Sequence, residues 1–348
     1  MTGAEAYREA GVDLEAQDRA LAGIGGLVKS TFTESVLSGL GAFGGLFALP
    51  ASAQDPVLVA SADGVGTKLS VARMAGDFST VGGDLVNHCV NDILVQGATP
   101  LFFLDYVGAG KLKGPAMREL VGGVAGACIA NRCALLGGET AEMPGFYQPG
   151  DYELVGFIVG VVERDRILDG SAVRSGDALI GLASAGLHTN GFSLARRAFF
   201  DLAGLDLLSP LPGSERTVRD ALLAPHLSYL SVLEPLLGDP RLHALAHITG
   251  GGLTDNLPRV LPPGLGAVIE TDGWNVPEDF LAIQRLADVD TGEMYRVFNM
   301  GIGMVLVVEP AGVEGLVREL EAAGGRAFVL GSVRPGEGVS YVGEMESA

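Results

Sequence analysis

The sequence is poor in cysteine, and its few cysteines form no recognisable pattern. It has 3 cysteines and 5 histidines in 348 residues, with no Cys-x-x-Cys pair. An odd number of scattered cysteines argues against a disulfide framework, and the spacings do not match a zinc site. We therefore expect reduced core cysteines, as in a cytoplasmic protein, at Cys89, Cys128 and Cys133.

The chain also lacks long apolar runs. Residues 1–20 contain five acidic residues and two arginines but no apolar core, so they do not resemble a signal peptide. The uncharged stretches 38–54 and 120–131 are too short, or too rich in glycine and proline, to cross a bilayer. We expect no membrane segment, and no repeat architecture because no period of about 20–50 residues is visible.

Basic residues are scarce, whereas glycine is abundant. The 23 Lys and Arg residues face 42 Asp and Glu, a formal net charge of −19, which disfavours binding to nucleic acid or anionic lipid. The 52 glycines follow no Gly-X-Y period and 48% of residues are hydrophobic, which excludes collagen and disorder. If glycine loops bind phosphate here, backbone N–H groups or a metal ion must replace surface cations.

Hydrophobic periodicity predicts strands and helices mixed along the whole chain. Expected strands are 56–62, 101–107, 133–136, 155–162, 178–183, 267–271, 304–308 and 327–333. Expected helices are 14–29, 80–96, 115–131, 192–203, 218–237 with a break at Pro225, and 313–323. The length favours two domains, 1–168 and 169–348, with the boundary in the charged segment 163–176. Both halves are then α+β domains of the α/β sandwich type.

Two glycine motifs imitate nucleotide-binding fingerprints. Gly39-x-Gly41-x-x-Gly44 matches the dinucleotide string, but a helix precedes it and Leu49-Pro50 follows it. The segment is a loop, either over a phosphate site or as a plain connector. Gly108–Leu112 resembles the end of a P-loop, but Asp105 replaces the first glycine and Leu112 the expected Ser or Thr, so a P-loop is rejected.

The first segment with a chemical signature is Asp63–Lys68, directly after an expected strand. A carboxylate at a strand's carboxyl end stands where open α/β sheets bind ligands. Gly64 and Gly66 allow backbone N–H groups to approach phosphate oxygens, and Lys68 adds a positive charge. The alternative interpretation is a glycine turn with a solvated aspartate and lysine.

The second segment with a chemical signature is one side of the expected helix 80–96. At 100° per residue its polar residues fall within an arc of about 140°, and they are Asp84, Asn87, His88, Asn91 and Asp92. The stripe has no Lys, Arg or Glu, unlike an ordinary solvated helix face, and short carboxylates and amides are what Mg²⁺ prefers. This composition favours a site over a solvated face.

The third segment with a chemical signature is Gly137–Gly145, which again follows an expected buried strand and contains Glu139. Asp63, Asp92 and Glu139 converge on one or two metal ions if their elements are neighbours. Asp105 either binds the metal with them or holds these ligands in place without binding the metal itself. Repulsion among the carboxylates is tolerable only with cations or protons present.

Two further glycine loops carry histidines in the second half, at Gly186–Ser193 and at His247–Gly252. Thr189 or Asn190 is expected to cap a helix starting near Phe192, and another helix is expected to open at Thr254–Asn256. Free N–H groups at such places suit a phosphate ester, and either histidine can move a proton near neutral pH. Taken alone, the residues predict a Mg-nucleotide or phosphate-ester enzyme without a P-loop.

The order of these motifs is similar to that of one family. Asp63–Lys68, 90–98, 101–106, Gly137–Gly145, His188–Ser193, His247–Gly252 and 294–299 occur in the order found in phosphoribosylformylglycinamidine cyclo-ligases. The resemblance covers nearly the whole chain, from about Tyr7 to beyond Gly331. It implies an ATP- and Mg²⁺-dependent ligase of purine biosynthesis that closes the imidazole ring of formylglycinamidine ribonucleotide. ATP phosphorylates the formyl oxygen, and the amidine nitrogen then displaces phosphate.

The resemblance also implies a two-domain PurM-like fold and a homodimer. Residues 1–168 would bind ATP and form a β-barrel shared between subunits, and residues 169–348 would form the C-terminal α/β domain. Two positions depart from the family pattern, since Gly25 stands where lysine is common and Ala62 where threonine is common. Any role of that lysine must fall to Lys29 or be dispensable.

Carried over residue by residue, the resemblance implies four groups of site residues. The metal ligands are Asp63, Asp92 and Glu139. The ATP-binding residues are Gly64, Val65, Gly66, Thr67, Lys68, Asn91, Asp105 and Glu139. The substrate-binding residues are Thr189, Asn190, Gly191, Ser193, Gly250, Gly251 and Gly252. The catalytic residues are Lys68, His188 and His247, and which histidine carries the proton stays open.

Related enzymes are the main alternatives. Selenophosphate synthetase is expected to need a reactive cysteine near the N-terminus, but the first cysteine here is Cys89. Thiamine-phosphate kinase is expected to have aspartate in place of Glu139, and formylglycinamidine ribonucleotide synthase lacks the 139–145 string. A non-catalytic nucleotide sensor is the alternative from another class, and turnover distinguishes it.

Overall fold

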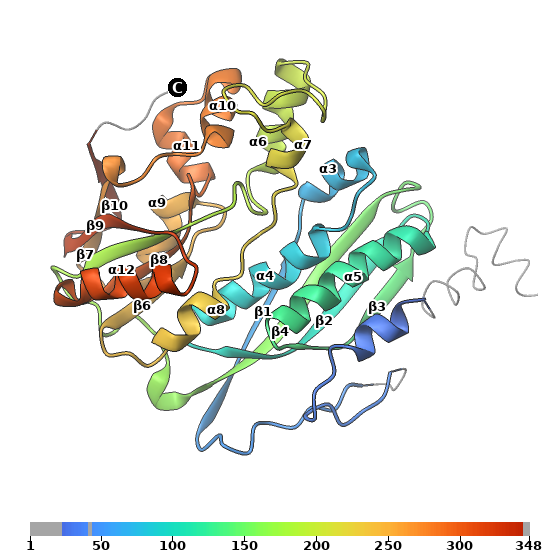
Figure 1. Ribbon diagram of the computed structural model, residues 1–348, viewed down its shortest axis with the longest axis horizontal. Helices are drawn as coiled ribbons and strands as arrows, with labels where there is room; N and C mark the ends of the chain where they lie inside the picture. The colour runs from blue at the N-terminus through green and yellow to red at the C-terminus, as the bar shows by residue number, and fades with distance from the viewer. Residues whose placement is uncertain (1–22, 41–43, 344–348) are drawn as a thin grey trace, which may run out of the picture. The chain divides into compact units, whose positions relative to one another are not determined.

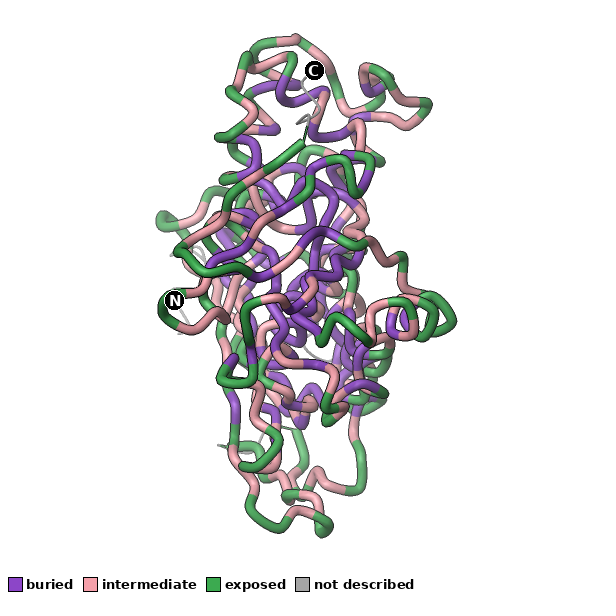
Figure 2. The backbone as a smooth tube through the Cα atoms, turned by 90° about the vertical axis from the view of Figure 1, so that its left-hand side faces the viewer, coloured by how far each residue is buried: buried purple, intermediate pink, exposed green. Residues whose placement is uncertain are grey.

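The computed structural model describes residues 23–40 and 44–343 and divides the chain into two compact units. Unit 1 comprises Met1–Ile93 and Pro100–Glu163, and unit 2 comprises Leu94–Thr99 and Arg164–Ala348. Buried positions follow the inner parts of strands and helices, while exposed positions concentrate on the connecting loops (Figure 2). The assignment of separate functions to residues 1–168 and 169–348 stays a prediction.

Unit 1 is built on a four-stranded mixed sheet with the order β1-β4-β2-β3. Strand β1 (Pro56–Gly64) pairs antiparallel with β4 (Tyr152–Glu163), and β2 (Thr99–Ala109) pairs parallel with β3 (Ala134–Glu142). All four strands are predicted by the periodicity. Each strand is longer than predicted at one or both ends. In β1 and β3 the added residues, 63–64 and 137–142, belong to the site segments and continue the pairing.

Helices α4 (Val81–Leu94) and α5 (Gly114–Ala130) lie side by side along this sheet (Figure 1). They approach closely through glycine, since a Cβ on Gly82 would overlap the backbone carbonyl of Leu120 and come within 2.7 Å of the Val124 nitrogen. Pro115 stands in the first turn of α5, as predicted. The short helix α3 (Lys68–Ala75) is not predicted, because the site motif occupies its first residues.

Unit 2 contains a six-stranded sheet with the order β10-β7-β9-β5-β8-β6. Only the β10–β7 pair is parallel among the strand pairs of the described chain in this sheet. Its strands are β5 (Ala178–Ala183), β6 (Leu242–His247), β7 (Leu265–Glu270), β8 (Ile302–Val308), β9 (Ala327–Pro335) and β10 (Val339–Val342). Every residue of β8 is buried, as expected for its continuous apolar sequence.

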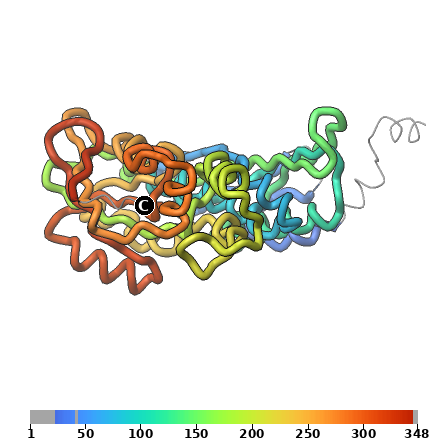
Figure 3. The backbone as a smooth tube through the Cα atoms, turned by 90° about the horizontal axis from the view of Figure 1, so that it is seen from above, coloured from blue at the N-terminus to red at the C-terminus, as the bar shows by residue number. Residues whose placement is uncertain are grey.

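The helices of unit 2 are short. They are α6 (Phe192–Arg196), α7 (Val218–Leu222), α8 (Leu230–Leu233), α9 (Gly252–Asn256), α10 (Glu278–Ala287), α11 (Thr291–Val297) and α12 (Val313–Ala322). Helix α12, red in Figure 3, lies along the outside of the sheet and buries Leu316 and Leu320. This confirms the predicted apolar face of residues 313–323.

Three helix predictions in unit 2 need correction. The helix predicted over 192–203 ends as an α-helix at Arg196 and continues as a π-helix, Arg197–Leu202. The helix predicted over 218–237 is broken over residues 223–229, more widely than at Pro225 alone, because Leu223 and Tyr229 leave helical geometry. The helix predicted to open at Thr254 begins at Gly252 and ends at Asn256.

At the N-terminal end, the predicted helix 14–29 lies partly outside the described residues, and residues 23–29 are helical. The loop 38–45 is likewise only partly described. No helix of the described chain is both apolar enough and long enough to span a bilayer.

The glycine contact between α4 and α5 generates a stability prediction. Gly82→Ala inserts a methyl group against the backbone of α5 and is expected to destabilise the protein by about 1–3 kcal/mol, measured by urea unfolding. The matched control is Gly126→Ala in α5, where a Cβ meets nothing within 4 Å. That variant is expected to be neutral or stabilising by up to about 1 kcal/mol. Equal effects of the two substitutions would contradict the close approach.

The pairing of β2 with β3 generates a second prediction. Asp105 lies opposite Gly138, and burial raises the pKa of its carboxyl from the usual 3.8 to about 7. The folded protein then binds more protons than the unfolded chain between these values, so its stability falls as the pH rises from 4 to 7. Asp105→Asn removes this dependence and is expected to gain stability over the parent at pH 8 but not at pH 4. Thermal midpoints of both proteins across this range test it, and parallel pH curves would contradict it.

Candidate functional site

The polar side of α4 is buried, so the alternative of a solvated helix face is wrong. Asp84 is 1% exposed, His88 4% and Asn91 0%, while Asn87 accepts a hydrogen bond from the Asn131 amide at 2.9 Å. Buried polar groups need partners within the fold. Asp84 finds its partner in Lys68, and His88 finds its partner in Asp63.

Lys68 and Asp84 form a fully buried ion pair. Lys68 Nζ lies 2.6 Å from Asp84 Oδ2, and both side chains are 0% exposed. Burial lowers the pKa of the Lys68 ammonium, and the charge and hydrogen bond of Asp84 oppose that shift. The structure therefore places the lysine of the Asp63–Lys68 motif inside the unit, where it ties the start of α3 to α4. Its predicted role in binding ATP and in catalysis stays a prediction.

His88 links two of the three predicted metal ligands. His88 Nε2 lies 2.8 Å from Asp63 Oδ2 at the end of β1 and 3.9 Å from Asp92 Oδ2 one helical turn along α4. Burial disfavours charge on the imidazole, but the hydrogen bond to Asp63 and the nearby carboxylates outweigh it and raise the pKa of His88. The Asp63 and Asp92 side chains are 41% and 25% exposed, so both carboxylates remain accessible to a ligand.

The turn after β1 lines a cavity of about 550 Å³. Gly66 has a φ of 63°, which favours glycine, and Thr67 is the N-cap residue of α3 without a side-chain cap bond. Val65 is completely buried and anchors the turn. The cavity residues from this turn and its surroundings include Asp63, Gly64, Gly66, Thr67, Arg73 and Tyr147. Four of the predicted site residues thus meet at one cavity.

Glu139 lies at a different cavity, of about 780 Å³, on the β2–β3 side of the sheet. Asp105 of β2 and Gly138 and Glu139 of β3 line it together with apolar residues such as Leu136 and Phe157. Gly138 allows the approach of the strands here, because a Cβ would overlap the carboxylate of Asp105. Asp63 and Asp92 therefore lie near each other through His88, and Asp105 and Glu139 line one cavity. The three predicted metal ligands do not form one cluster, because Glu139 lies at the other cavity.

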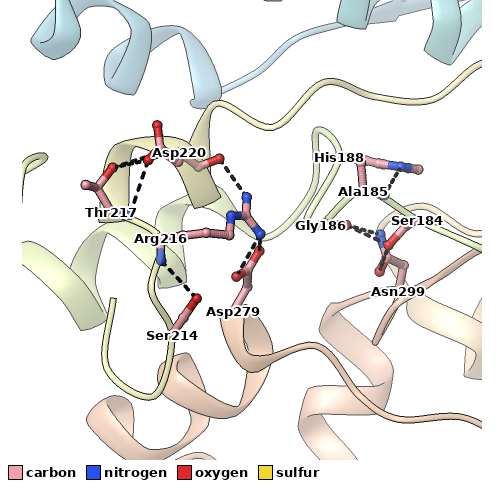
Figure 4. A network of polar contacts seen from close by, with 10 residues as sticks. All are labelled: Ser184, Ala185, Gly186, His188, Ser214, Arg216, Thr217, Asp220, Asp279 and Asn299. Carbon is pink, nitrogen blue, oxygen red and sulfur yellow. Dashed lines mark hydrogen bonds and ion pairs between the residues drawn. The ribbon is translucent and has the colours of Figure 1, made fainter. Parts of the chain in front are cut away.

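In unit 2 the loop Gly186–Ser193 is held by Asn299 (Figure 4). The Asn299 amide nitrogen donates to the Gly186 carbonyl at 3.0 Å. The single hydroxyl hydrogen of Ser184 has two acceptors within reach, Asn299 Oδ1 at 3.1 Å and the Gly186 carbonyl at 2.9 Å. Asn299 is 3% exposed. Asn299, the last residue of the 294–299 motif, therefore holds the loop Gly186–Ser193 in position.

The predicted cap of the following helix is wrong. The helix begins at Phe192, as expected, but its N-cap residue is Gly191 with a φ of 76°, and no side chain caps it. Thr189 and Asn190 point elsewhere because the loop turns at Gly191, where a Cβ would overlap the Phe298 ring. Thr189 Oγ1 lies 3.3 Å from His226 Nδ1, and Ser193 is exposed in the first turn of the helix.

The loop His247–Gly252 is shaped by a single amide. The Asn256 side chain donates to the carbonyls of Gly250 at 3.2 Å and Gly252 at 2.9 Å, which turns the chain back on itself. Gly251 and Gly252 have positive φ values of 100° and 58°. A Cβ on Gly250 would lie 3.3 Å from Asn190 Oδ1, so the two predicted substrate loops meet.

Arg216 and Asp279 are site neighbours that the sequence does not single out. Arg216 Nη1 lies 3.2 Å from Asp279 Oδ2, and its Nη2 donates to the Asp220 carbonyl at 2.7 Å (Figure 4). Burial raises the pKa of Asp279, and the Arg216 charge opposes that shift. The Asp279 carboxylate packs against Gly186. No motif links these residues, which are more than 60 positions apart.

His226 is the other residue that sequence reasoning missed. It joins His188 and His247, the two candidate proton carriers, into one buried cluster within unit 2. The one local signal is its position after Pro225, in the predicted helix break. Two glycine loops and one proline turn therefore bring three of the 5 histidines together.

Comparison with known proteins places this chain in a family. The model described as AIR synthase related protein, N-terminal domain, matches residues 46–162, and that described as AIR synthase related protein, C-terminal domain, matches residues 174–343. Among solved structures, thiamine-monophosphate kinase from Stenotrophomonas maltophilia has a TM-score of 0.68 at 16% identity, covering 93% of this chain and 97% of that chain. The hydrogenase maturation protein HypE in complex with ATP has a TM-score of 0.64 at 18% identity, covering 89% and 84%. These similarities confirm the two-domain PurM-like fold.

Sequence relatives are far more similar. A phosphoribosylformylglycinamidine cyclo-ligase of Trichlorobacter lovleyi is 51% identical over 329 residues, covering 94% of both chains. Another, of Desulfitobacterium hafniense, is 49% identical over 339 residues, covering 97% of this chain and 99% of the relative. With matches that run through both units and motifs in the predicted order, the chain belongs to the phosphoribosylformylglycinamidine cyclo-ligase family.

Proposed function

We propose that this protein closes the imidazole ring of formylglycinamidine ribonucleotide in an ATP- and Mg²⁺-dependent reaction that yields aminoimidazole ribonucleotide, ADP and phosphate. The identity of about half of all residues with relatives of that name, over nearly their full length, carries the proposal. The fold neighbours solved with ATP or an ATP analogue support the use of ATP.

The cavity at the turn after β1 is our proposed ATP site. Gly64 and Gly66 line the cavity, and the buried Val65 and Lys68 hold the turn in place. The Gly64 N–H already donates to Asp63 Oδ1 at 2.6 Å, so we propose that phosphate oxygens approach the turn at Gly66. Asn91 is fully buried on α4, so we propose a supporting role for it. Asp105 and Glu139 line the second cavity, where we propose a separate contribution to nucleotide binding.

Asp63 and Asp92 fit a magnesium site. Both are partly exposed, and their carboxylates approach the same nitrogen of His88, so two hard oxygen donors face one small volume. Bound Mg²⁺ would neutralise charge on the transferring phosphoryl group. His88 meanwhile holds the two carboxylates in place by hydrogen bonding and charge. We propose Glu139 as a ligand only in combination with the nucleotide, because it lies at the other cavity.

Unit 2 supplies groups for the second substrate. The loops around Thr189–Ser193 and Gly250–Gly252 meet at Asn190, and they present backbone and hydroxyl groups suited to a ribose phosphate. The amidine nitrogen must lose a proton as it attacks the activated formyl carbon, and phosphate leaves with the formyl oxygen. His188 or His247 accepts that proton. We further propose a homodimer that acts in the cytoplasm.

The first test is turnover. Purified protein mixed with ATP, Mg²⁺ and formylglycinamidine ribonucleotide is expected to release ADP and the aminoimidazole product in equal amounts, measured by chromatography. Omitting either the ribonucleotide or Mg²⁺ is the control, and both omissions are expected to abolish ADP release. ADP release that needs neither would contradict the cyclo-ligase assignment, and an absence of turnover would favour a nucleotide sensor.

The second test concerns the metal ligands. Asp92→Asn keeps the shape of the side chain and a hydrogen bond from Ser61 Oγ, but it removes a charge from the proposed Mg²⁺ site. The Mg²⁺ concentration for half-maximal activity is expected to rise at least about tenfold, with the thermal midpoint little changed. Asp165→Asn, at an exposed aspartate outside the site, is the matched control. An unchanged Mg²⁺ requirement in Asp92→Asn would remove Asp92 from the metal site.

A further inference from the structure

His226 has a neighbour on each polar edge and on one face of its ring. Its Nδ1 lies 3.3 Å from Thr189 Oγ1, and its Nε2 lies 3.2 Å from His247 Nε2. The ring of His188 stacks on it with centroids 4.1 Å apart and an interplanar angle of 22°. His226 is 1% exposed, His188 2% and His247 7%, so the three rings are buried.

The contact between His226 and His247 requires one shared proton. Two neutral imidazoles can bond through their Nε2 atoms only if one of them is protonated there and the other presents a lone pair. If His226 donates, its Nδ1 is an acceptor and Thr189 donates to it. If His247 donates instead, His226 Nδ1 carries a hydrogen and Thr189 accepts. The row Thr189–His226–His247 thus has two proton arrangements with the same heavy-atom positions.

His188 is held in one orientation beside this row. The Ala185 N–H donates to His188 Nε2 at 3.3 Å, and the Leu227 N–H, next to His226 in the chain, donates to the same atom at 3.5 Å. An Nε2 that accepts hydrogen bonds leaves the proton of the neutral ring on Nδ1. His188 also has a positive φ of 58°, a conformation that the loop must maintain.

The stack and the hydrogen bond also couple the charges of the three rings. Two imidazolium rings at a centroid distance of 4.1 Å repel strongly inside a protein, so a proton taken up by one ring lowers the affinity of the others. Tyr229, whose ring centroid lies 6.3 Å from that of His188, donates its hydroxyl to the Ala183 carbonyl at 2.9 Å. Burial raises the pKa of Tyr229, so it adds no charge to the cluster.

We propose that His226 is a positioning residue for His188 and the partner of His247 in a proton relay. It holds the ring of His188 by stacking and sets the protonation of His247 through the shared hydrogen bond. A proton that His247 takes from the reacting amidine nitrogen displaces its own proton along the shared hydrogen bond to His226 Nε2, and His226 releases its Nδ1 proton towards Thr189 Oγ1. The identity of the proton donor, the amidine nitrogen, rests on the proposed function. The contacts among the three histidines do not depend on it.

The kinetic test replaces His226 by glutamine, which keeps one hydrogen bond but cannot pass a proton. His226→Gln is expected to lower kcat by about 100-fold, with the KM values for ATP and the ribonucleotide within about twofold of the parent. The pH profile of kcat is expected to shift by about one unit or more, because the coupled titration of the cluster is lost. A purely structural role would lower the amount of folded enzyme without moving this profile.

The matched control is His243→Gln. His243 lies on the same strand as His247, but its Nδ1 pairs with Asp177 Oδ2 at 2.7 Å, away from the cluster. This variant is expected to keep both kcat and its pH profile. If His226→Gln behaves like His243→Gln, or if its kcat falls with an unchanged pH profile, the relay is overturned.

A spectroscopic test does not depend on turnover. In the parent protein labelled with ¹⁵N-histidine, the ring nitrogens are expected to show Nδ1–H for His188 and a single proton shared between His226 and His247. His226→Gln is expected to change the ring-nitrogen shifts of His188 and His247, whereas His243→Gln leaves them unchanged. Unaltered shifts in His226→Gln would overturn the relay. If no cyclisation is detected while the shifts behave as expected, the proposed function fails and the relay stands.

Discussion

Burial of the polar side of α4 is the constraint on which the functional part of unit 1 depends. A helix with Asp84, His88 and Asn91 inside the protein requires a partner for each polar group. Lys68 meets Asp84 in a dry ion pair, and Asp63 meets His88. Removing one partner of such a buried pair costs several kcal/mol, about 3–5, because the other charge stays behind. These contacts therefore fix the end of β1, the glycine turn and the start of α3 relative to α4, and with them the cavity that we propose for phosphate.

The same constraint bears on how a chain of net charge −19 would bind ATP, the polyanion that we propose as its substrate. Lys68 is not a surface cation, because it is fully buried against Asp84. The cavity beside the turn is lined by carboxylates such as Asp63 and, among the described residues, by one basic residue, Arg73. In the proposed function, the carboxylates of Asp63 and Asp92 would attract phosphate only through a bound cation, and His88 reduces their mutual repulsion. Most of the 42 acidic residues lie outside this cavity.

Unit 2 uses a different principle, in which glycine turns bring neutral groups together. Gly191, Gly251 and Gly252 adopt positive φ values, so loops from two strands approach closely enough for Asn190 to reach Gly250. Asn256 and Asn299 satisfy the carbonyls that these turns expose. The turns leave room for three histidine rings in contact, which a regular helix–strand connection would separate.

Much of this protein is determined by local sequence. Alternation and apolar runs predict the strands of unit 1 and the central strands of unit 2, because strand burial depends on neighbouring residues. The stripe on α4 favours a site over a solvated face, and motif order predicts the family. The ends of the short helices of unit 2 differ from the prediction, because they depend on packing and on turns such as Gly191. Only the tertiary structure decided that Lys68 turns inward, that Glu139 lies apart from Asp63, and that His226 joins His188 and His247. These contacts join residues tens of positions apart, and no periodicity within one segment records which distant side chain will lie opposite it.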